Sequence, residues 1–347
     1  MFVYILIFSW IWYIYSLFSR KPIPQKSKRF TISPILYPNI WTCYKKQQGH
    51  FWTEDNIDYT QDVVDWKKMH PDLQKVYKMV FAIFSFLDCL VNENISSIEE
   101  DLPDHYLEAK AFLHAQEAME DIHQKTYSDI IEILLPEERD ELLKNAGKTE
   151  YVKKKVELTC RRRGSNVSLA ERIIANGCVE GIGFSGLFAP IFWLKGNNLL
   201  PGVRFANEEI ITDESIHLEG AREIYESLVK DGEIERLSQN SVEDIVEDFV
   251  EVEIECTREI LSVKDKAILR DLTIENMAEY IKFVADFYLK SLGYKIKYGA
   301  KNPFPFMDAT GLITKSNFFE KSVAEYKQTQ LNDTSANEIK TDLKMNF

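Results

Sequence analysis

Cysteine is scarce in this chain, and its spacing excludes several kinds of site. The 347 residues contain no Cys-x-x-Cys motif, and the odd number of cysteines does not fit a disulfide framework. The five cysteines lie far apart, at Cys43, Cys89, Cys160, Cys178 and Cys256. The sequence therefore favours a reducing compartment and argues against a zinc site built on cysteine pairs. It also offers no cysteine pair for dithiol chemistry of its own.

Basic residues are outnumbered by acidic ones. The protein has 42 Lys and Arg against 55 Asp and Glu, which gives a net charge of −13. This balance argues against nucleic acid as the main partner. With 45% hydrophobic residues, the sequence is long enough for one large domain with a single core and tails, or for two small domains.

Charge is absent from residues 1–19, which hold eight aromatic residues among the first eighteen. Five basic residues follow, at Arg20, Lys21, Lys26, Lys28 and Arg29. About 19 apolar residues are just long enough to span a bilayer, and positive charge after them keeps the following domain in the cytoplasm. We expect residues 1–28 to form a separate apolar segment with a basic linker. It is a membrane anchor, an apolar extension lying on the protein, or the product of a mis-set start codon.

Sustained alternation with a period of two, the mark of half-buried strands, is rare in this sequence. Helical patterns dominate instead, and they predict helices at residues 71–92, 103–135, 169–194, 205–229, 242–261 and 274–292. The first and third become apolar on all sides, which is typical of buried core helices. The predicted fold class is therefore all-α, with a helical domain over residues 29–312 and a flexible tail over residues 313–347.

Two motifs place a carboxylate and a histidine three residues apart, so that both side chains project from one helix face. Two more carboxylates stand alone in apolar runs without Lys or Arg, and each precedes one motif by 32 or 34 residues. The six residues are Asp88, Glu120, His123, Glu180, Glu214 and His217. Four acids and two histidines from pseudo-symmetric helical hairpins are the ligand set of a di-metal carboxylate centre, and two divalent cations would neutralise the acids. Oxygen-rich ligation favours iron(II) or manganese(II), whereas the alternative is a set of ordinary surface acids and core histidines.

Tyr127 follows His123 by four residues, so Glu120, His123 and Tyr127 form one stripe on the same helix. The phenol is thus expected about one turn from the metal ions. Phe184, Phe188 and Ile210 are expected to form a dry sleeve beside it. Because water and reductants destroy a tyrosyl radical, such a sleeve indicates a redox role for Tyr127 rather than that of a core tyrosine.

Longer motifs in the sequence resemble those of the small subunit of class I ribonucleotide reductase. They run from about residue 29 to the C-terminus and include FWTEDNIDYTQD, FLDCLVNEN, AMEDIHQKTY, VEGIGFSG, TDESIH, YIKFVAD, NPFPFMD and KSNFFEKSVAEY, in the order of the family. The resemblance implies a ferritin-like helical bundle and a homodimer. It also implies a large-subunit partner and the production of deoxyribonucleotides for DNA synthesis.

The resemblance further implies roles for individual residues. Two iron ions, or manganese, would be bound by the six residues above, and Tyr127 would carry the radical. Trp52 and Asp213 match the relay that passes the radical towards the large subunit, and Tyr326 matches the tyrosine of the tail that passes it across the interface. Phe347 matches the C-terminal residue of the tail that docks on the large subunit.

Two positions depart from the family pattern. Thr212 stands where an arginine usually precedes the Asp-Glu pair, which puts the bracing of Asp213 in question. Gly183 replaces a bulkier residue, which would loosen the pocket. Three other interpretations stay open: a membrane-attached di-iron oxidase of the alternative-oxidase type, a ferritin-like iron-storage protein, and a degenerate small subunit that stabilises an active sibling.

Overall fold

The computed structural model describes residues 28–161 and 166–308, and these two ranges hold helices and loops but no strand. The predictions for residues 1–27 and for the tail beyond residue 308 lie outside them. The helices are α2 (Pro38–Gly49), η1 (Glu54–Asn56), α3 (Thr60–Lys68), α4 (Pro71–Asp101), α5 (Leu107–Leu134), α6 (Arg139–Ala146), α7 (Glu150–Arg161), α8 (Leu169–Cys178), η2 (Val179–Gly183), α9 (Phe184–Asn197), α10 (Pro201–Asp231), α11 (Gln239–Ile260), η3 (Lys266–Leu269), α12 (Ile274–Ser291) and η4 (Pro305–Met307).

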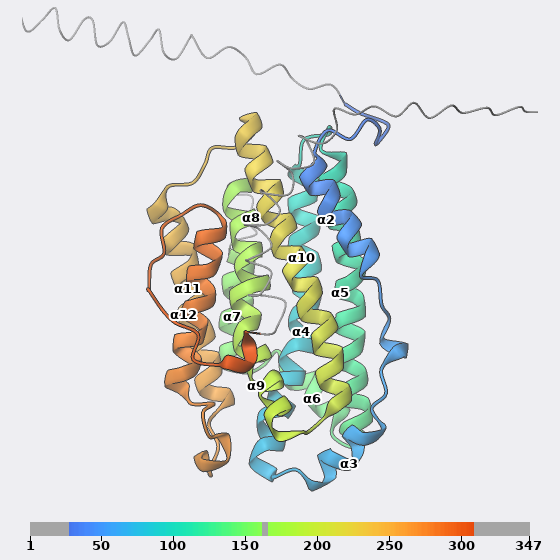
Figure 1. The fold of residues 1–347 in the computed structure, drawn as a ribbon, viewed down its shortest axis with the longest axis vertical. Helices are drawn as coiled ribbons and strands as arrows, with labels where there is room; N and C mark the ends of the chain where they lie inside the picture. Colours follow the sequence, from blue (N-terminus) through green and yellow to red (C-terminus); the bar gives the residue numbers. More distant parts are fainter. Residues whose placement is uncertain (1–27, 162–165, 309–347) are drawn as a thin grey trace, which may run out of the picture.

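Long helices aligned with the long axis of the molecule form the core (Figure 1). Helix α4 packs on α5, and α10 packs on α5, α8 and α9. Helix α2 covers the α5–α10 side, while α11 and α12 cover the side of α8 and α9. The interior is therefore a four-helix arrangement of α4, α5, the α8–α9 run and α10, wrapped by further helices.

Local sequence signals explain where these helices begin and end. Ser168 and Glu171 form a capping box at the start of α8. Pro201 occupies the first turn of α10, where a missing N–H costs nothing. Gly232 ends α10 with a positive φ of 73°, a conformation that glycine adopts without strain.

All six predicted segments are helical, but one of them is not α-helical throughout. The segment predicted as a single helix over residues 169–194 is divided into α8, the π-helical turn η2 and α9. Helix α4 continues to Asp101, and the pattern missed the shorter helices α2, α3, α6 and α7. Helices α2, α3 and α6 are short and contain few apolar residues, so they give a weak periodic signal. Helix α7 is clearly amphipathic and was missed in spite of its pattern.

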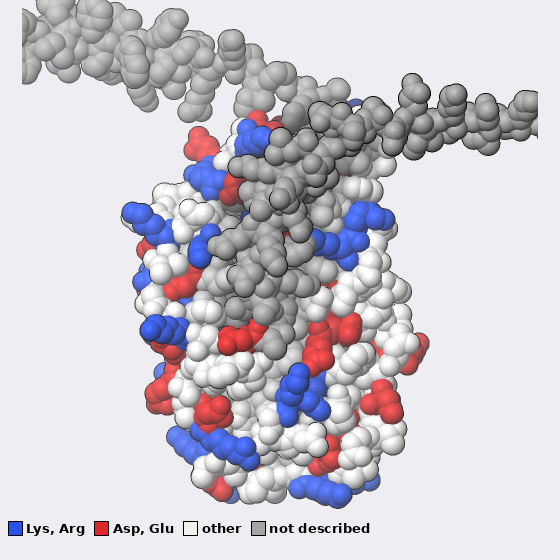
Figure 2. Space-filling model, in the orientation of Figure 1, with Lys and Arg blue, Asp and Glu red and all other residues white. Residues whose placement is uncertain are grey.

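Two runs of the described residues are long and apolar enough to cross a membrane: α4 and the continuous run Leu169–Asn197. In the most apolar window of the second run, 94% of the residues are buried inside the protein. Both runs belong to the helical core, so their apolar character is explained by packing. Acidic and basic side chains are interspersed over the described part of the face seen in Figure 2.

Candidate metal centre

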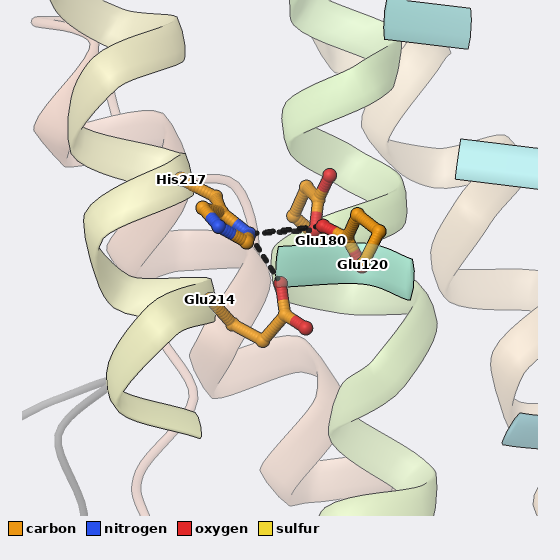
Figure 3. Close-up of side chains that lie close together, drawn as sticks. All are labelled: Glu120, Glu180, Glu214 and His217. Atoms are coloured by element: carbon orange, nitrogen blue, oxygen red, sulfur yellow. Dashed lines mark hydrogen bonds and ion pairs between the residues drawn. The ribbon is translucent and has the colours of Figure 1, made fainter. Parts of the chain in front are cut away.

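Five of the six carboxylates and histidines predicted from the sequence converge between α5, α10 and η2. Glu120 and His123 lie in α5, Glu214 and His217 in α10, and Glu180 in η2. One ligand atom from each residue of the set Glu120, Glu180, Glu214 and His217 lies within 4.8 Å of the others (Figure 3). All five side chains are at most 1% exposed. The interior therefore holds a compact, dry group of oxygen and nitrogen ligands.

Two carboxylates each face both histidines. Glu120 places Oε1 3.0 Å from Nδ1 of His217 and Oε2 3.3 Å from Nδ1 of His123. Glu214 places Oε2 3.0 Å from Nδ1 of His217 and Oε1 3.2 Å from Nδ1 of His123. Glu180 approaches one histidine only, with Oε2 3.7 Å from Nδ1 of His217. Glu120 and Glu214 would therefore hold metal together with both histidines, and Glu180 would do so beside His217.

Several atoms of the cluster lack a hydrogen-bond partner. Oε1 of Glu120, Oε2 of Glu180 and Nε2 of His217 are buried without one, although Nδ1 of His217 lies near both oxygens. Buried polar atoms are nearly always satisfied, so each exception needs an explanation. Three buried carboxylates with fewer donors than oxygen atoms around them fit a divalent cation, and the mixture with imidazole suits iron(II) or manganese(II).

The pKa shifts of the carboxylates and histidines also favour a bound cation. Burial raises the pKa of Glu180 well above its usual range, and the charges of Glu120 and Glu214 raise it further. Burial alone would raise the pKa of Glu214 as well, but hydrogen bonds with His123 and His217 hold it below its usual range. Burial opposes the charged form of both histidines, yet the carboxylates raise their pKa values well above 6.5. Protons on Glu180 and on the histidines would thus balance the negative charge of the carboxylates, and a bound cation would replace these protons.

The second ring nitrogen of His123, Nε2, also has a buried partner. Nε2 of His123 lies 3.0 Å from Oδ2 of Asp213, and the indole N–H of Trp52 donates to the same oxygen at 2.8 Å. The side-chain amide of Gln47 donates to Oδ1 of Asp213 at 2.6 Å. A carboxylate that holds the far nitrogen of a metal-binding histidine fixes the orientation of the ring. The predicted relay residues Trp52 and Asp213 therefore form one buried hydrogen-bonded series with His123.

Tyr127 lies one turn beyond His123 in α5 and is fully buried. Its phenolic O–H donates to Oδ1 of Asn207 at 2.6 Å. The amide N–H of Asn207 donates to the carbonyl of Val203 at 2.8 Å, which fixes the orientation of the amide. Asn207 was not predicted, although it precedes Glu214 by seven residues and thus shares its face of α10.

The apolar surroundings of Tyr127 centre on Phe84, which was also not predicted. The two rings stack with centroids 4.3 Å apart and an interplanar angle of 3°. Phe84 in turn contacts Phe184 at 5.5 Å and Phe188 at 5.0 Å. The predicted phenylalanines therefore line the pocket behind Phe84, and Ile210 is buried at 1% exposure in α10.

Comparison with known proteins shows which family this protein is similar to. The sequence model described as "Ribonucleotide reductase, small chain" matches residues 29–303. The ribonucleoside-diphosphate reductase small chain of Variola virus is 38% identical over 329 residues, which cover 93% of this protein and 99% of that relative. One of the small chains of Arabidopsis thaliana is 40% identical over 307 residues, which cover 87% of this protein and 89% of the relative. This protein belongs to the ribonucleotide reductase small-chain family.

Structural comparison agrees with this membership. The ribonucleotide reductase Rnr4 homodimer of Saccharomyces cerevisiae superimposes with a TM-score of 0.72 at 27% identity, covering 88% of this protein and 92% of that one. The predicted ferritin-like fold and the predicted oxidoreductase class are thus confirmed. The alternative-oxidase and iron-storage interpretations give way to the small-chain interpretation. The family match begins at residue 29 and so leaves the apolar N-terminal segment outside it.

The structure describes the environments of both departures from the small-chain pattern. The hydroxyl of Thr212 donates to the carbonyl of Glu208 in its own helix, at 2.9 Å. Among the hydrogen bonds of the described residues, those from Gln47 and Trp52 brace Asp213. Gly183 lies beside a cavity of about 20 Å³, which Phe184 also lines. Its carbonyl accepts a hydrogen bond from Lys155 at 2.8 Å.

The side chains of three predicted site residues lie outside what the structure describes. The backbone of Asp88 belongs to α4, but its side chain lies outside what the structure describes. Tyr326 and Phe347 belong to the tail beyond residue 308. The structure adds Gln116, which was not predicted and whose amide donates to Oε1 of Glu180 at 2.8 Å. Gln116 precedes Glu120 by four residues, so it extends the stripe of α5 by one turn.

Proposed function

We propose that this protein is the radical-generating small subunit of a ribonucleoside-diphosphate reductase, with the radical on Tyr127. The observation that carries this proposal is a buried phenol one helical turn from a dry group of carboxylates and histidines. Its relatives are named as small chains of the same enzyme. The protein would work in the cytoplasm and as a homodimer, and the structure of the yeast relative is that of a homodimer.

The metal ligands in this proposal are Asp88, Glu120, His123, Glu180, Glu214 and His217. Glu120 and Glu214 would hold metal together with both histidines, because each faces both of them. Two iron ions would supply the oxidising chemistry for the loss of one electron and the phenolic proton from Tyr127, with dioxygen as the oxidant that is reduced and takes up the proton. Manganese is the other metal that suits these ligands.

The protein contributes orientation and dryness. Oδ1 of Asn207 accepts a hydrogen bond from the phenolic O–H of Tyr127 and so fixes the direction of that bond. Phe84 covers the ring of Tyr127, and Phe184 and Phe188 lie behind it, so water is kept from the phenol. An apolar enclosure lengthens the life of a radical because it excludes reductants.

A separate large subunit is required for ribonucleotide reduction. The sequence has no Cys-x-x-Cys motif, and Cys43 and Cys256 are buried and form no disulfide among the described residues. The radical would leave through His123, Asp213 and Trp52, and then pass by Tyr326 to the partner. Phe347 would dock the tail on that partner, which would then supply deoxyribonucleotides for DNA synthesis.

Electron paramagnetic resonance on the reconstituted protein tests the proposal. The metal-free protein is loaded with iron(II), or with manganese(II), and exposed to oxygen. A tyrosyl signal that persists for minutes and turnover after addition of a matched large subunit are expected. Quinol oxidation without a radical, or bulk mineralisation of iron, would contradict the proposal.

A change at Trp52 tests the relay separately from radical formation. Trp52→Phe removes the indole N–H that donates to Asp213 while keeping an aromatic ring. We expect turnover with the large subunit to fall by about 100-fold or more, as when one oriented donor is lost from an active site. Metal content should not change. Trp66→Phe, at another buried tryptophan, is the control and should leave turnover near normal.

Metal uptake should release protons and depend on pH. The pKa of Glu180 is raised by burial and by the charges of Glu120 and Glu214, and the carboxylates raise the pKa values of both histidines, so a cation must compete with protons for these groups. Affinity for manganese(II) should therefore rise from pH 6 to pH 8, by up to about tenfold per pH unit for each proton released. Titration at several pH values, with proton release measured in unbuffered solution, checks this. An affinity that does not change with pH would contradict the assignment of these protons.

A further inference from the structure

A second buried charged cluster lies outside the metal centre, where α7 and α11 meet the start of α9. Lys155 of α7 and Glu253 of α11 form an ion pair with Nζ and Oε2 2.5 Å apart. Their side chains are 7% and 1% exposed. Neither residue is a metal ligand, and neither lies in the relay or the pocket of Tyr127. Because buried ion pairs rarely repay their desolvation, this pair calls for a role beyond stability.

Both partners of the pair also bind the backbone at one place. Nζ of Lys155 donates to the carbonyl of Gly183, the last residue of η2, at 2.8 Å. Oε1 of Glu253 accepts the backbone N–H of Gly186, in the first turn of α9, at 3.0 Å. The ion pair therefore spans the junction at which the π-helical turn gives way to α-helix.

The residues at this junction leave room for the side chains of the ion pair. A Cβ atom on Gly186 would lie 2.3 Å from Oε1 of Glu253, so only glycine lets the carboxylate reach the backbone. The hydroxyl of Ser185 donates to the carbonyl of Ile182 at 2.7 Å. Side chains thus take over hydrogen bonds of the backbone at a point where the helix changes its type.

The type of helix at this point decides where Glu180 points. A π turn holds one residue more than an α turn, and one residue corresponds to about 100° of rotation about the helix axis. If η2 relaxed to α-helix, the residues before the junction would turn by about that angle relative to Phe184 and Phe188. Glu180 would then leave the group that it forms with Glu120, Glu214 and His217.

We propose that the buried Lys155–Glu253 ion pair is a positioning device for the metal centre, which holds η2 in the π-helical form that directs Glu180 at the metal ions. Lys155 and Glu253 act through the backbone of Gly183 and Gly186 and touch no metal themselves. This inference rests on the proposed function, because it takes Glu180 as a ligand.

A neighbouring pair on the same two helices offers a matched control. Lys154 and Glu255 form an ion pair of 2.6 Å between α7 and α11, but their side chains are 44% and 47% exposed. Removing this pair changes the same helix contact and the same number of charges. It leaves the η2–α9 junction untouched.

Cobalt(II) binding is the test, because its visible spectrum reports the number and kind of its ligands. The metal-free wild type, Lys155→Met/Glu253→Gln and Lys154→Met/Glu255→Gln are titrated with cobalt(II), and the thermal unfolding of each is recorded. We expect the buried double variant to fold, to bind cobalt(II) at least about tenfold more weakly, and to show an altered spectrum. The surface double variant should match the wild type in both.

Three results would overturn the proposal. One is an unchanged isotherm and spectrum in the folded buried variant. Another is equal weakening in the surface variant, which would indicate general packing of α7 on α11. The third applies if the buried double variant does not fold: an unaltered cobalt(II) spectrum in Glu253→Gln. This single variant keeps an acceptor for Gly186 but loses the charge of the carboxylate. A wild type that binds no cobalt(II) would instead contradict the proposed function itself.

Discussion

Tyr127→Phe is expected to abolish the radical signal completely while leaving metal uptake at the level of the wild type. Phenylalanine keeps the ring that stacks on Phe84 but has no O–H bond to lose. Oδ1 of Asn207 would lose its donor inside the protein, which costs about 1–3 kcal/mol of stability. Reconstitution with iron(II) and oxygen, followed by paramagnetic resonance, metal analysis and denaturant unfolding, measures all three effects.

Tyr77 provides the matched control for this experiment. It is another fully buried tyrosine, and its hydroxyl donates to the carbonyl of Pro190 at 2.8 Å. Tyr77→Phe should lose a comparable amount of stability and keep the radical. A signal of normal yield in Tyr127→Phe would move the radical to another tyrosine and remove the central element of the proposed function.

The sequence was sufficient to locate most of the candidate metal centre. The two acid-x-x-His motifs lie in long regular helices, where a spacing of three residues determines the shared face. Apolar surroundings then separated Glu180 from the many surface acids. Local periodicity carries this information, so Glu120, His123, Glu214 and His217 could be grouped without knowledge of the tertiary structure.

The missed residues depend on contacts between distant parts of the sequence. Gln47 and Asp213 are 166 positions apart, and no local pattern links them. Phe84 could have been noticed as the residue one turn before Asp88, but its stacking on Tyr127 depends on how α4 packs on α5. Short-range patterns do not encode such pairings, which arise only when the core assembles.

The π-helical turn escaped prediction for a related reason. Placing Phe184 and Phe188, four and eight residues after Glu180, on the same face as Glu180 assumes an uninterrupted α-helix, whereas the type of helix changes after Gly183. The groups bound to the backbone at this junction, Lys155 and Glu253, come from other helices. Helix type at such a point is thus a tertiary property, although the glycines at 181, 183 and 186 were a visible signal of irregular backbone.

Glu180→Gln should change metal binding and stability in opposite directions. Glutamine keeps the shape of the side chain and an acceptor for Gln116, but it is a poor metal ligand. Affinity for at least one of the two ions should fall by about 100-fold. The folded-state pKa of Glu180 lies well above its unfolded value of 4.5, so at neutral pH folding must either ionise a buried acid or retain its proton. Removing this penalty should stabilise the metal-free protein by roughly 1–2 kcal/mol at pH 7.

The pH dependence of that gain separates it from a general effect on packing. Glu180 is protonated in the folded and the unfolded states alike below about pH 4, so the stabilisation by glutamine should disappear there and grow as the pH rises through 4.5. Glu208→Gln, at an exposed position of α10, should change neither metal affinity nor the pH profile. Unfolding of the metal-free proteins at pH 4 and pH 7 decides the matter. A variant that is less stable than the wild type at pH 7 would mean that the carboxylate of Glu180 is stabilised in the folded protein by its neighbours, and that the site does not depend on a cation to neutralise it.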